Sequence, residues 1–334
     1  MFDPLAFARR LIDIPSPTDH EREAGEFLFA QLQMLGYECR RHEIAPNRFN
    51  VFASAGGRPR VVINSHIDTV PPWFASSEDG EFIFGRGACD TKGIIAAMIA
   101  AGERLRGQGV RDFAFLFVVA EETDSIGAKK ANEEFAAIGS EYVIVGEPTE
   151  SLFARASKGA LTAVVRFDGI AGHSAYPQRG DSAINKLVAA VAEINATDWG
   201  THEILGKATA NVGVIRGGEK ANIIAAKAEM EMMFRIVTEV DEVSKRLDAL
   251  VRRHGGHIVR SHGNPPQLMT VPDGAKSAVV AFNTDVPHLK ALGKPLLFGP
   301  GSILDAHGPS ERIAKKDLLA AIETYERTVT SLLR

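Results

Sequence analysis

Histidine and carboxylate side chains follow several apolar segments of this sequence, at positions where they could bind a metal ion. His66 and Asp68 come directly after the apolar segment "RVVINS". They stand two residues apart, so in an extended chain both side chains point to the same side. Alone, the pair would equally fit a histidine that ends a strand and an aspartate that caps a turn.

Further acidic and imidazole residues occur in similar places. Asp90 precedes a helical segment, where it could also serve as an N-cap that stabilises by about 1 kcal/mol. Glu121 and Glu122 follow "FAFLFVVA", and Glu147 follows "YVIVG". Adjacent carboxylates at a buried strand end repel each other unless a positive charge lies near, although a solvated loop would also hold them. His307 lies between glycine and proline turns near the C-terminus.

Together these residues supply the nitrogen and oxygen ligands that suit zinc, cobalt or manganese. Two metal ions about 3.5–4 Å apart need some five ligands, one of them bridging. The five candidates are His66, Asp90, Glu122, Glu147 and His307. A ligating imidazole usually donates its other N–H to a carboxylate, and Asp68 can accept it. Water activated by the ions needs a base to take its proton, and Glu121, beside a ligand, is well placed.

The elements that must position these residues have the pattern of an α/β domain. Three segments are apolar at successive positions and rich in Val, Ile and Phe, as is typical of parallel strands covered on both faces. These predicted strands are 60–65, 113–120 and 142–146. Helical periodicity predicts connecting helices over 21–35, 91–106 and 128–135. Because ligands gather beyond the carboxyl ends of such strands, we expect the candidate residues to lie there together.

From about Lys158 the pattern changes to alternating strands and amphipathic helices. The predicted strands are 160–169, 210–218, 226–237 and 257–261, and the predicted helices are 181–194 and 239–253. Their order, βαββαβ, predicts an inserted ferredoxin-like domain. We expect 277–282 and 295–299 to return to the first sheet, followed by a helix over 314–333. The predicted catalytic domain is therefore 1–157 and 267–334, and the predicted lid or dimerisation domain is 158–266.

Composition narrows the class of protein. The chain has 334 residues, enough for two domains with their own cores. Its net charge of -4 argues against nucleic-acid binding and leaves small molecules as the expected partners. Two cysteines do not predict a disulfide framework and favour a reducing compartment. The N-terminal residues contain no long apolar segment, so we expect neither a signal peptide nor a membrane anchor, and a cytoplasmic location.

Five ordered motifs resemble the M20 family of metallopeptidases and amidohydrolases, nearest to its acetylornithine deacetylase and succinyl-diaminopimelate desuccinylase branch. They are "SHIDTVP", "GRGACDTKG", "AEET", "GEPT" and "AHGPSE". The resemblance implies two metal ions. Zinc is the first candidate for them, and cobalt or manganese are the alternatives. One ion would be held by His66, Asp90 and Glu147, and the other by Asp90, Glu122 and His307. Asp90 would bridge them and precede a cis peptide bond.

The resemblance also implies roles for residues around the metals. Glu121 would be the general base, Asp68 would orient His66, and His173, in "GHSAY", would stabilise the oxyanion, within one chain or across a homodimer formed by the inserted domain. The residues implied to contact substrate or line its pocket are Asn222, Arg235, Thr284, Gly299 and Gly301. Arg235 could instead be a solvated charge on a lid strand.

A rival interpretation of "GHSAY" is a nucleophile elbow with the pattern G-x-S-x-G and Ser174 as nucleophile. Tyr176 replaces the last glycine of that pattern, where a bulky residue would obstruct the tight packing of strand on helix. The pattern therefore favours the histidine role.

The expected activity is that of a metal-dependent hydrolase of linear amide C–N bonds. It removes an N-acyl group from an amino acid, with acetyl as the first candidate for that group. The alternatives are a desuccinylase-like deacylase, a dipeptidase or carboxypeptidase of the same family, and a metal-free binding module without catalysis.

Overall fold

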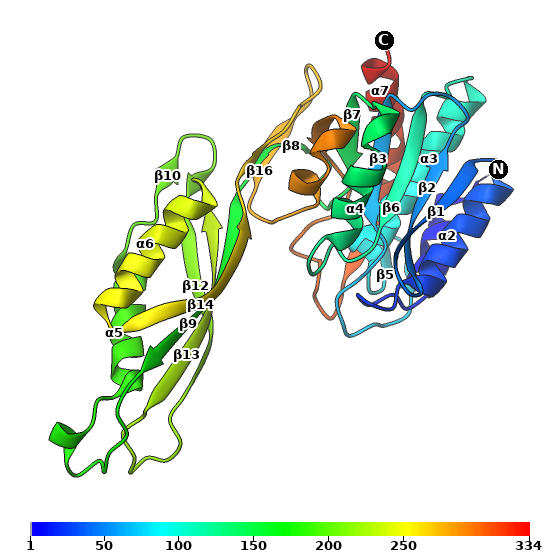
Figure 1. Ribbon diagram of the computed structural model, residues 1–334. Coiled ribbons are helices and arrows are strands. Elements are labelled where there is room, and N and C mark those ends of the chain that lie inside the picture. Colours follow the sequence, from blue (N-terminus) through cyan, green and yellow to red (C-terminus); the bar gives the residue numbers. More distant parts are fainter. Residues whose placement is uncertain (1) are drawn as a thin grey trace. The chain divides into compact units, whose positions relative to one another are not determined.

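The computed structural model describes residues 2–334 and consists of two compact units (Figure 1). Unit 1 comprises the residues up to Arg155 together with Met269–Ala278 and Thr284–Arg334, and unit 2 comprises Ala156–Leu268 and Val279–Asn283. Each unit has its own hydrophobic core.

Unit 1 is built on a six-stranded sheet with the order β1-β2-β6-β3-β7-β17. Its strands are β1 (Glu38–Ala45), β2 (Arg48–Ser54), β3 (Val61–His66), β6 (Phe113–Val118), β7 (Tyr142–Val145) and β17 (Lys294–Leu297). β3 is parallel to β6 and β7, and β17 is parallel to β7, whereas β2 is antiparallel to both β1 and β6. The prediction of a mostly parallel sheet in an α/β fold is confirmed.

The central strands are buried on both faces, as their continuous apolar sequences predict. β3 and β6 contain only buried residues. Alternate side chains of β6, including Phe113, Phe115 and Phe117, belong to the main core. A Cβ atom at Gly102 of the helix α3 (Gly93–Gly107) would lie 2.5 Å from the ring of Phe115. The glycine therefore allows the helix to pack closely against the sheet.

The helices of unit 1, apart from the first, agree with the predicted helices to within a few residues. They are α1 (Pro4–Ile12), α2 (Arg22–Met34), α3, α4 (Ile126–Glu134) and α7 (Lys315–Leu332). α3 packs against α1 and α7, and α4 contacts β1, β2 and β6. A small second sheet has the order β18-β5-β4, formed by Arg312–Ala314, Phe82–Phe84 and Ser77–Glu78. The sequence analysis did not predict α1, β1 or β2.

Unit 2 contains the predicted βαββαβ order. Its elements are β9 (Gly159–Asp168), α5 (Ala183–Ala196), β12 (Thr209–Gly217), β13 (Lys227–Ile236), α6 (Val240–Arg253) and β14 (Gly256–Asn264), with a short pair, β10 (Thr201–His202) and β11 (Gly206–Lys207). The main strands form an antiparallel sheet with the order β12-β13-β9-β14. The ferredoxin-like prediction is therefore confirmed.

One predicted strand has a different partner. The segment 277–282 does not return to the first sheet; β16 (Ser277–Val280) joins β8 (Phe153–Ser157) and β15 (Gln267–Leu268) in a three-stranded sheet. The expectation was wrong because an apolar run predicts a strand but not its neighbour. The segment 295–299 behaves as expected, since β17 pairs with β7.

No helix among residues 2–334 is long and apolar enough to span a membrane.

Candidate metal centre

His66 is the last residue of β3 and is almost fully buried. Its Nδ1 atom lies 2.9 Å from the backbone oxygen of Asp68. The carboxylate of Asp68 is 3.6 Å from the same nitrogen, longer than a hydrogen bond. The imidazole is thus oriented through the carbonyl of Asp68, whereas the resemblance implied its carboxylate.

The carboxylate of Asp68 holds the glutamate pair instead. It accepts hydrogen bonds from the backbone N–H groups of Glu121 (3.1 Å) and Glu122 (3.2 Å), and from the hydroxyl of Thr18 (2.8 Å). The turn depends on Ala120, whose φ of 65° lies in the left-handed region, a conformation that costs a non-glycine residue roughly 1–2 kcal/mol. Burial alone would raise the pKa of Asp68, but its contacts with His66, Thr18 and Glu122 lower it overall.

Asp90 lies between two imidazoles. Its Oδ1 atom is 3.0 Å from Nε2 of His66, and its Oδ2 atom is 3.2 Å from Nε2 of His307. Burial would raise the pKa of this carboxyl, but the hydrogen bonds from the two histidines lower it below its usual range. One carboxylate with an imidazole at each oxygen has the arrangement of a bridging ligand. The Asp90–Thr91 peptide bond is cis, as the resemblance implied.

The remaining candidate ligands lie around this carboxylate. Glu122 Oε1 is 3.1 Å from Nε2 of His307, and Glu147 Oε2 is 4.0 Å from Nε2 of His66. Ligand atoms of His66, Asp90 and Glu122 lie within 4.8 Å of one another, and so do those of His66, Glu121 and Glu147. All seven predicted metal-centre residues are therefore neighbours, and Glu121, the predicted base, lies among the candidate ligands.

The charges of this cluster do not balance. Burial raises the pKa of Glu121 and Glu147 well above the usual value, and repulsion from neighbouring carboxylates adds to it. Hydrogen bonds to Asp90 and Glu122 raise the pKa of His307 to about 10. No ion pair that lysine or arginine forms in residues 2–334 includes the five carboxylates of the cluster. Five carboxylates against two imidazoles, with nitrogen and oxygen donors only, form a donor set that fits divalent cations.

Polar side chains that the sequence analysis did not identify hold the strand ends together. The Ser65 hydroxyl lies 2.8 Å from Oγ1 of Thr91 and 3.0 Å from the carbonyl of Gly146, and Thr91 donates to the carbonyl of His66 at 2.7 Å. These contacts join the segments that carry His66, Asp90 and Glu147. Both Ser65 and Thr91 stand inside the quoted motifs, which was the available signal.

Three predicted substrate residues of unit 1 have local structural partners. The hydroxyl of Thr284 accepts the N–H of Val286 at 3.2 Å. Gly299 exchanges hydrogen bonds with Thr149, and the carbonyl of Gly301 accepts the N–H of Glu150. A Cβ atom at Gly299 would lie 2.4 Å from the carbonyl oxygen of Glu147. The two glycines therefore support the loop after Glu147, and the substrate contacts of all three residues stay a prediction.

The other three predicted residues belong to unit 2. His173 and Asn222 are neighbours, because the N–H of Ser174 donates to the carbonyl of Asn222 and His173 forms a β-bridge with Ile223. Arg235 is partly buried on β13, where it faces Thr209 and Ala160 of the adjacent strands.

The structure disfavours Ser174 as a nucleophile. An elbow needs a tight turn from strand to helix, yet Ser174 is exposed in a loop, and α5 begins only at Ala183.

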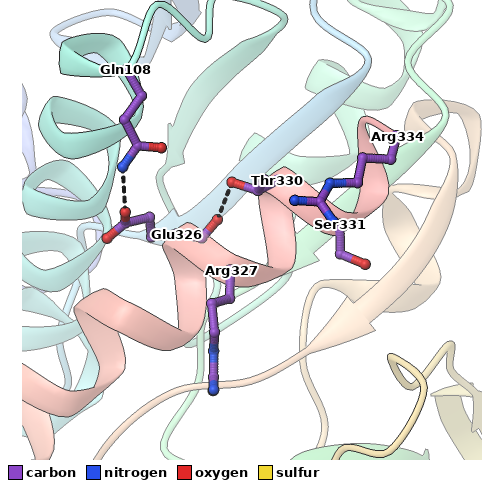
Figure 2. Close-up of a pocket in the computed structure, with 6 residues that line it drawn as sticks. All are labelled: Gln108, Glu326, Arg327, Thr330, Ser331 and Arg334. Carbon is purple, nitrogen blue, oxygen red and sulfur yellow. Dashed lines mark hydrogen bonds between the residues drawn. The ribbon is translucent and has the colours of Figure 1, made fainter.

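A hollow of about 390 Å³ lies on α7 in unit 1 (Figure 2). It is lined by Gln108, Glu326, Arg327, Thr330, Ser331 and Arg334. Glu326 accepts a hydrogen bond from Gln108 at 2.6 Å, and the hydroxyl of Thr330 donates to the backbone carbonyl of Glu326 at 2.8 Å. No candidate site residue lines this hollow.

Comparisons with known proteins place the chain in a family. A peptidase M20 domain-containing protein of Schizosaccharomyces pombe is 36% identical over 99% of this chain and 85% of its own length. A probable carboxypeptidase of Aspergillus flavus is 34% identical over 98% of this chain and 90% of its own length.

Solved structures share the fold. A tripeptidase of Staphylococcus aureus matches with a TM-score of 0.82 at 20% identity, covering 99% of this chain and 98% of its own. A structure from Bacillus subtilis, described as a dinuclear metal-binding peptidase, matches with a TM-score of 0.70 at 17% identity, covering 98% and 97%. Residues 62–331 match the model of peptidase family M20/M25/M40. With this match over most of its length, the chain belongs to the peptidase family M20/M25/M40.

Proposed function

We propose that the chain uses two divalent metal ions to hydrolyse the amide bond between an acyl group and the α-nitrogen of an amino acid with a free carboxylate. The position of Asp90, with an imidazole at each carboxylate oxygen, carries the proposal. His66, Asp90 and Glu147 would hold one ion, and Asp90, Glu122 and His307 the other. Zinc is the first candidate, and cobalt or manganese suit the same donors. The Bacillus subtilis structure of related fold, which is described as a dinuclear metal-binding peptidase, supports two ions rather than one.

Glu121 is the proposed proton carrier. Bound metal ions would acidify water and polarise the substrate carbonyl. Burial raises the pKa of Glu121, so its carboxylate is basic enough to accept a proton from water and later to deliver it to the leaving amine. Its N–H group, bonded to Asp68, fixes the residue next to the ligands.

Unit 2 is the proposed lid. Arg235 is half-buried, its pKa is lowered by burial, and it forms no ion pair within the described part of the chain. A guanidinium in this state is suited to a substrate carboxylate. His173 would stabilise the oxyanion, and Asn222, Thr284, Gly299 and Gly301 would complete the substrate pocket. The proposed domains remain 1–157 with 267–334 for catalysis and 158–266 for the lid.

Two substrate classes contain the proposed bond. The sequence motifs resemble those of deacylases, which favours an N-acetyl or N-succinyl amino acid. Relatives at 32–34% identity are named probable carboxypeptidases, which favours the C-terminal residue of a peptide. The comparisons do not support an acetylornithine-type specificity, so the peptide class has the stronger support.

Unit 2 also carries an apolar surface suited to a second copy of the chain. β12 is an edge strand, and Ile215 on it is 56% exposed. Val188 on α5 is 57% exposed. Because an open, apolar edge invites strand pairing, we include a homodimer through unit 2 in the proposal, together with a cytoplasmic location for a chain whose two cysteines are free.

Replacing Glu121 by Gln should lower kcat by about 10²–10⁴-fold while both metal ions stay bound, because only the proton carrier is lost. Activity assays with elemental analysis of the purified variant test this. Glu133→Gln, an exposed carboxamide substitution on α4, is the matched control and should keep full activity. Undiminished turnover by Glu121→Gln would refute the role.

Metal binding should release protons. With a pKa of about 10, His307 carries a proton at pH 7 in the metal-free protein, and this proton must leave before the nitrogen can bind a metal. Affinity should therefore fall as pH is lowered, by up to about tenfold per unit for each proton displaced. Calorimetry in buffers of different ionisation enthalpy measures the release, and His307→Asn should release fewer protons than the natural chain.

A substrate panel decides between the two classes. N-acetyl and N-succinyl amino acids should be compared with N-blocked peptides, each also in a C-terminally amidated form. Amidation should abolish hydrolysis of either class. Arg235→Met should raise KM by about 10–150-fold, because one charge-assisted hydrogen bond to the substrate carboxylate is lost. Arg216→Met on β12, whose side chain pairs with Glu231, is the control and should leave KM unchanged. Equal hydrolysis of amidated and free substrates would contradict carboxylate recognition.

The proposed dimer should separate when a charge is placed on the edge strand. Ile215→Lys is expected to sediment as one chain where the natural protein sediments as two. Met34→Lys, at an apolar position of α2 that is 72% exposed in unit 1, should leave the mass unchanged. A natural protein that sediments as one chain at micromolar concentration would reject the dimer.

A further inference from the structure

A buried ion pair outside the ligand set contacts two of the ligand segments. Arg86 Nη1 lies 2.6 Å from Glu311 Oε2, and the two side chains are 2% and 0% exposed. Neither residue is a candidate ligand or base. Ordering and desolvating two buried charges costs free energy, so the other hydrogen bonds of the pair indicate its role in the fold.

The free oxygen of Glu311 holds the backbone at the bridging carboxylate. Glu311 Oε1 accepts the N–H of Asp90 at 3.1 Å and the N–H of Cys89 at 3.3 Å. Arg86 reaches two other segments, because its Nε donates to the carbonyl of Pro72 at 3.2 Å and its Nη2 donates to the carbonyl of His307 at 3.4 Å. The pair thus links the backbone of Asp90 to the backbone of His307.

The two candidate metal positions differ in what else supports them. His66 ends the buried strand β3, and the residue before Glu147 donates its N–H to the carbonyl of Asn64 in that strand. His307, by contrast, stands in the loop between β17 and β18, with a left-handed φ of 62° and a side chain that is 50% exposed. The sheet therefore fixes the ligands of one ion, whereas the loop ligand of the other depends on contacts such as that with Arg86.

We propose that Arg86 and Glu311 are positioning residues that set the placement of His307 relative to Asp90, and so govern the affinity of the ion held by Asp90, Glu122 and His307 more than that of the other ion. The inference rests on the proposed two-metal function. Residues that orient ligands commonly change metal affinity by about 10–100-fold when they are replaced.

The test is a titration of the metal-free protein with Co²⁺, followed by calorimetry and by the visible absorption of the bound ion. Glu311→Gln keeps the shape of the side chain and removes its charge, and Arg86→Lys keeps the charge and removes the fork of donors. Each should weaken one of two binding steps by about tenfold or more, leave the other step within about threefold, and change the spectrum of the weakly bound ion. The double variant Arg86→Met with Glu311→Met should lose no more than the worse single variant, because the two residues act as a unit.

Arg48 and Glu21 supply the matched control. They form another ion pair of unit 1, with hydrogen bonds of 2.9 and 2.6 Å and side chains 14% and 1% exposed, but none of their hydrogen bonds reaches Asp90 or His307. Glu21→Gln should lower the melting temperature and leave both Co²⁺ steps unchanged.

The outcomes separate the two levels of the proposal. A natural chain that binds fewer than two ions refutes the proposed function itself. A natural chain that binds two ions, with variants that melt earlier yet bind both ions unchanged, shows a purely structural pair and overturns the inference. If Glu311→Gln does not fold, Arg86→Lys gives the same comparison, because it keeps a buried positive charge beside Glu311.

Discussion

Mutual repulsion among buried carboxylates is the constraint on which the rest of unit 1 depends. Asp68, Asp90, Glu121, Glu122 and Glu147 meet at the carboxyl ends of β3, β6 and β7. Removing such groups from water costs several kcal/mol each, and their proximity adds to that cost. Two imidazoles compensate part of the negative charge. The remaining repulsion, together with burial, raises the pKa of Glu121 and of Glu147. Such a cluster persists only if the surrounding fold holds it in place.

The fold holds it mainly through the backbone. Asp68 accepts two consecutive N–H groups of the glutamate turn, and Glu311 accepts two consecutive N–H groups at Asp90. In both places a buried carboxylate fixes the main chain next to a candidate metal-centre residue. Backbone donors cannot change rotamer, so they place the neighbouring side chains more firmly than contacts between long side chains would.

The sequence predicts those parts of the fold that follow from local pattern. Continuous apolar strands and helical periodicity located the parallel core, and alternation located the βαββαβ order of unit 2. α1, β1 and β2 were not found, and β1 in particular is a mostly solvent-exposed strand whose polar sequence has no apolar run. The pairing of 277–282 was wrong because strand partners are decided by the whole sheet.

The candidate ligands were accessible from sequence because each directly follows a buried strand or stands in a quoted motif, and the sheet brings strand ends together. Their supports were not accessible. His66 uses the carbonyl of Asp68 rather than its carboxylate, which depends on local side-chain geometry, and Glu311 reaches back to Asp90 across more than 200 residues of chain. A sequence pattern contains no information on such distances. The backbone contacts of Gly299 and Gly301 near Glu147 were not accessible either, and their substrate contacts stay a prediction.

The order of the chain gives unit 1 a demanding folding problem. Nearly all of unit 2 is one continuous segment, Ala156–Leu268, with its own core, so it can fold from contacts close in sequence. Arg86, in contrast, is buried beside a partner that is synthesised 225 residues later. On a ribosome the inserted module can therefore be complete while the part of unit 1 that carries the candidate ligands still lacks β17, His307 and Glu311. The charged centre of this protein is consequently among the last parts of the molecule to take shape.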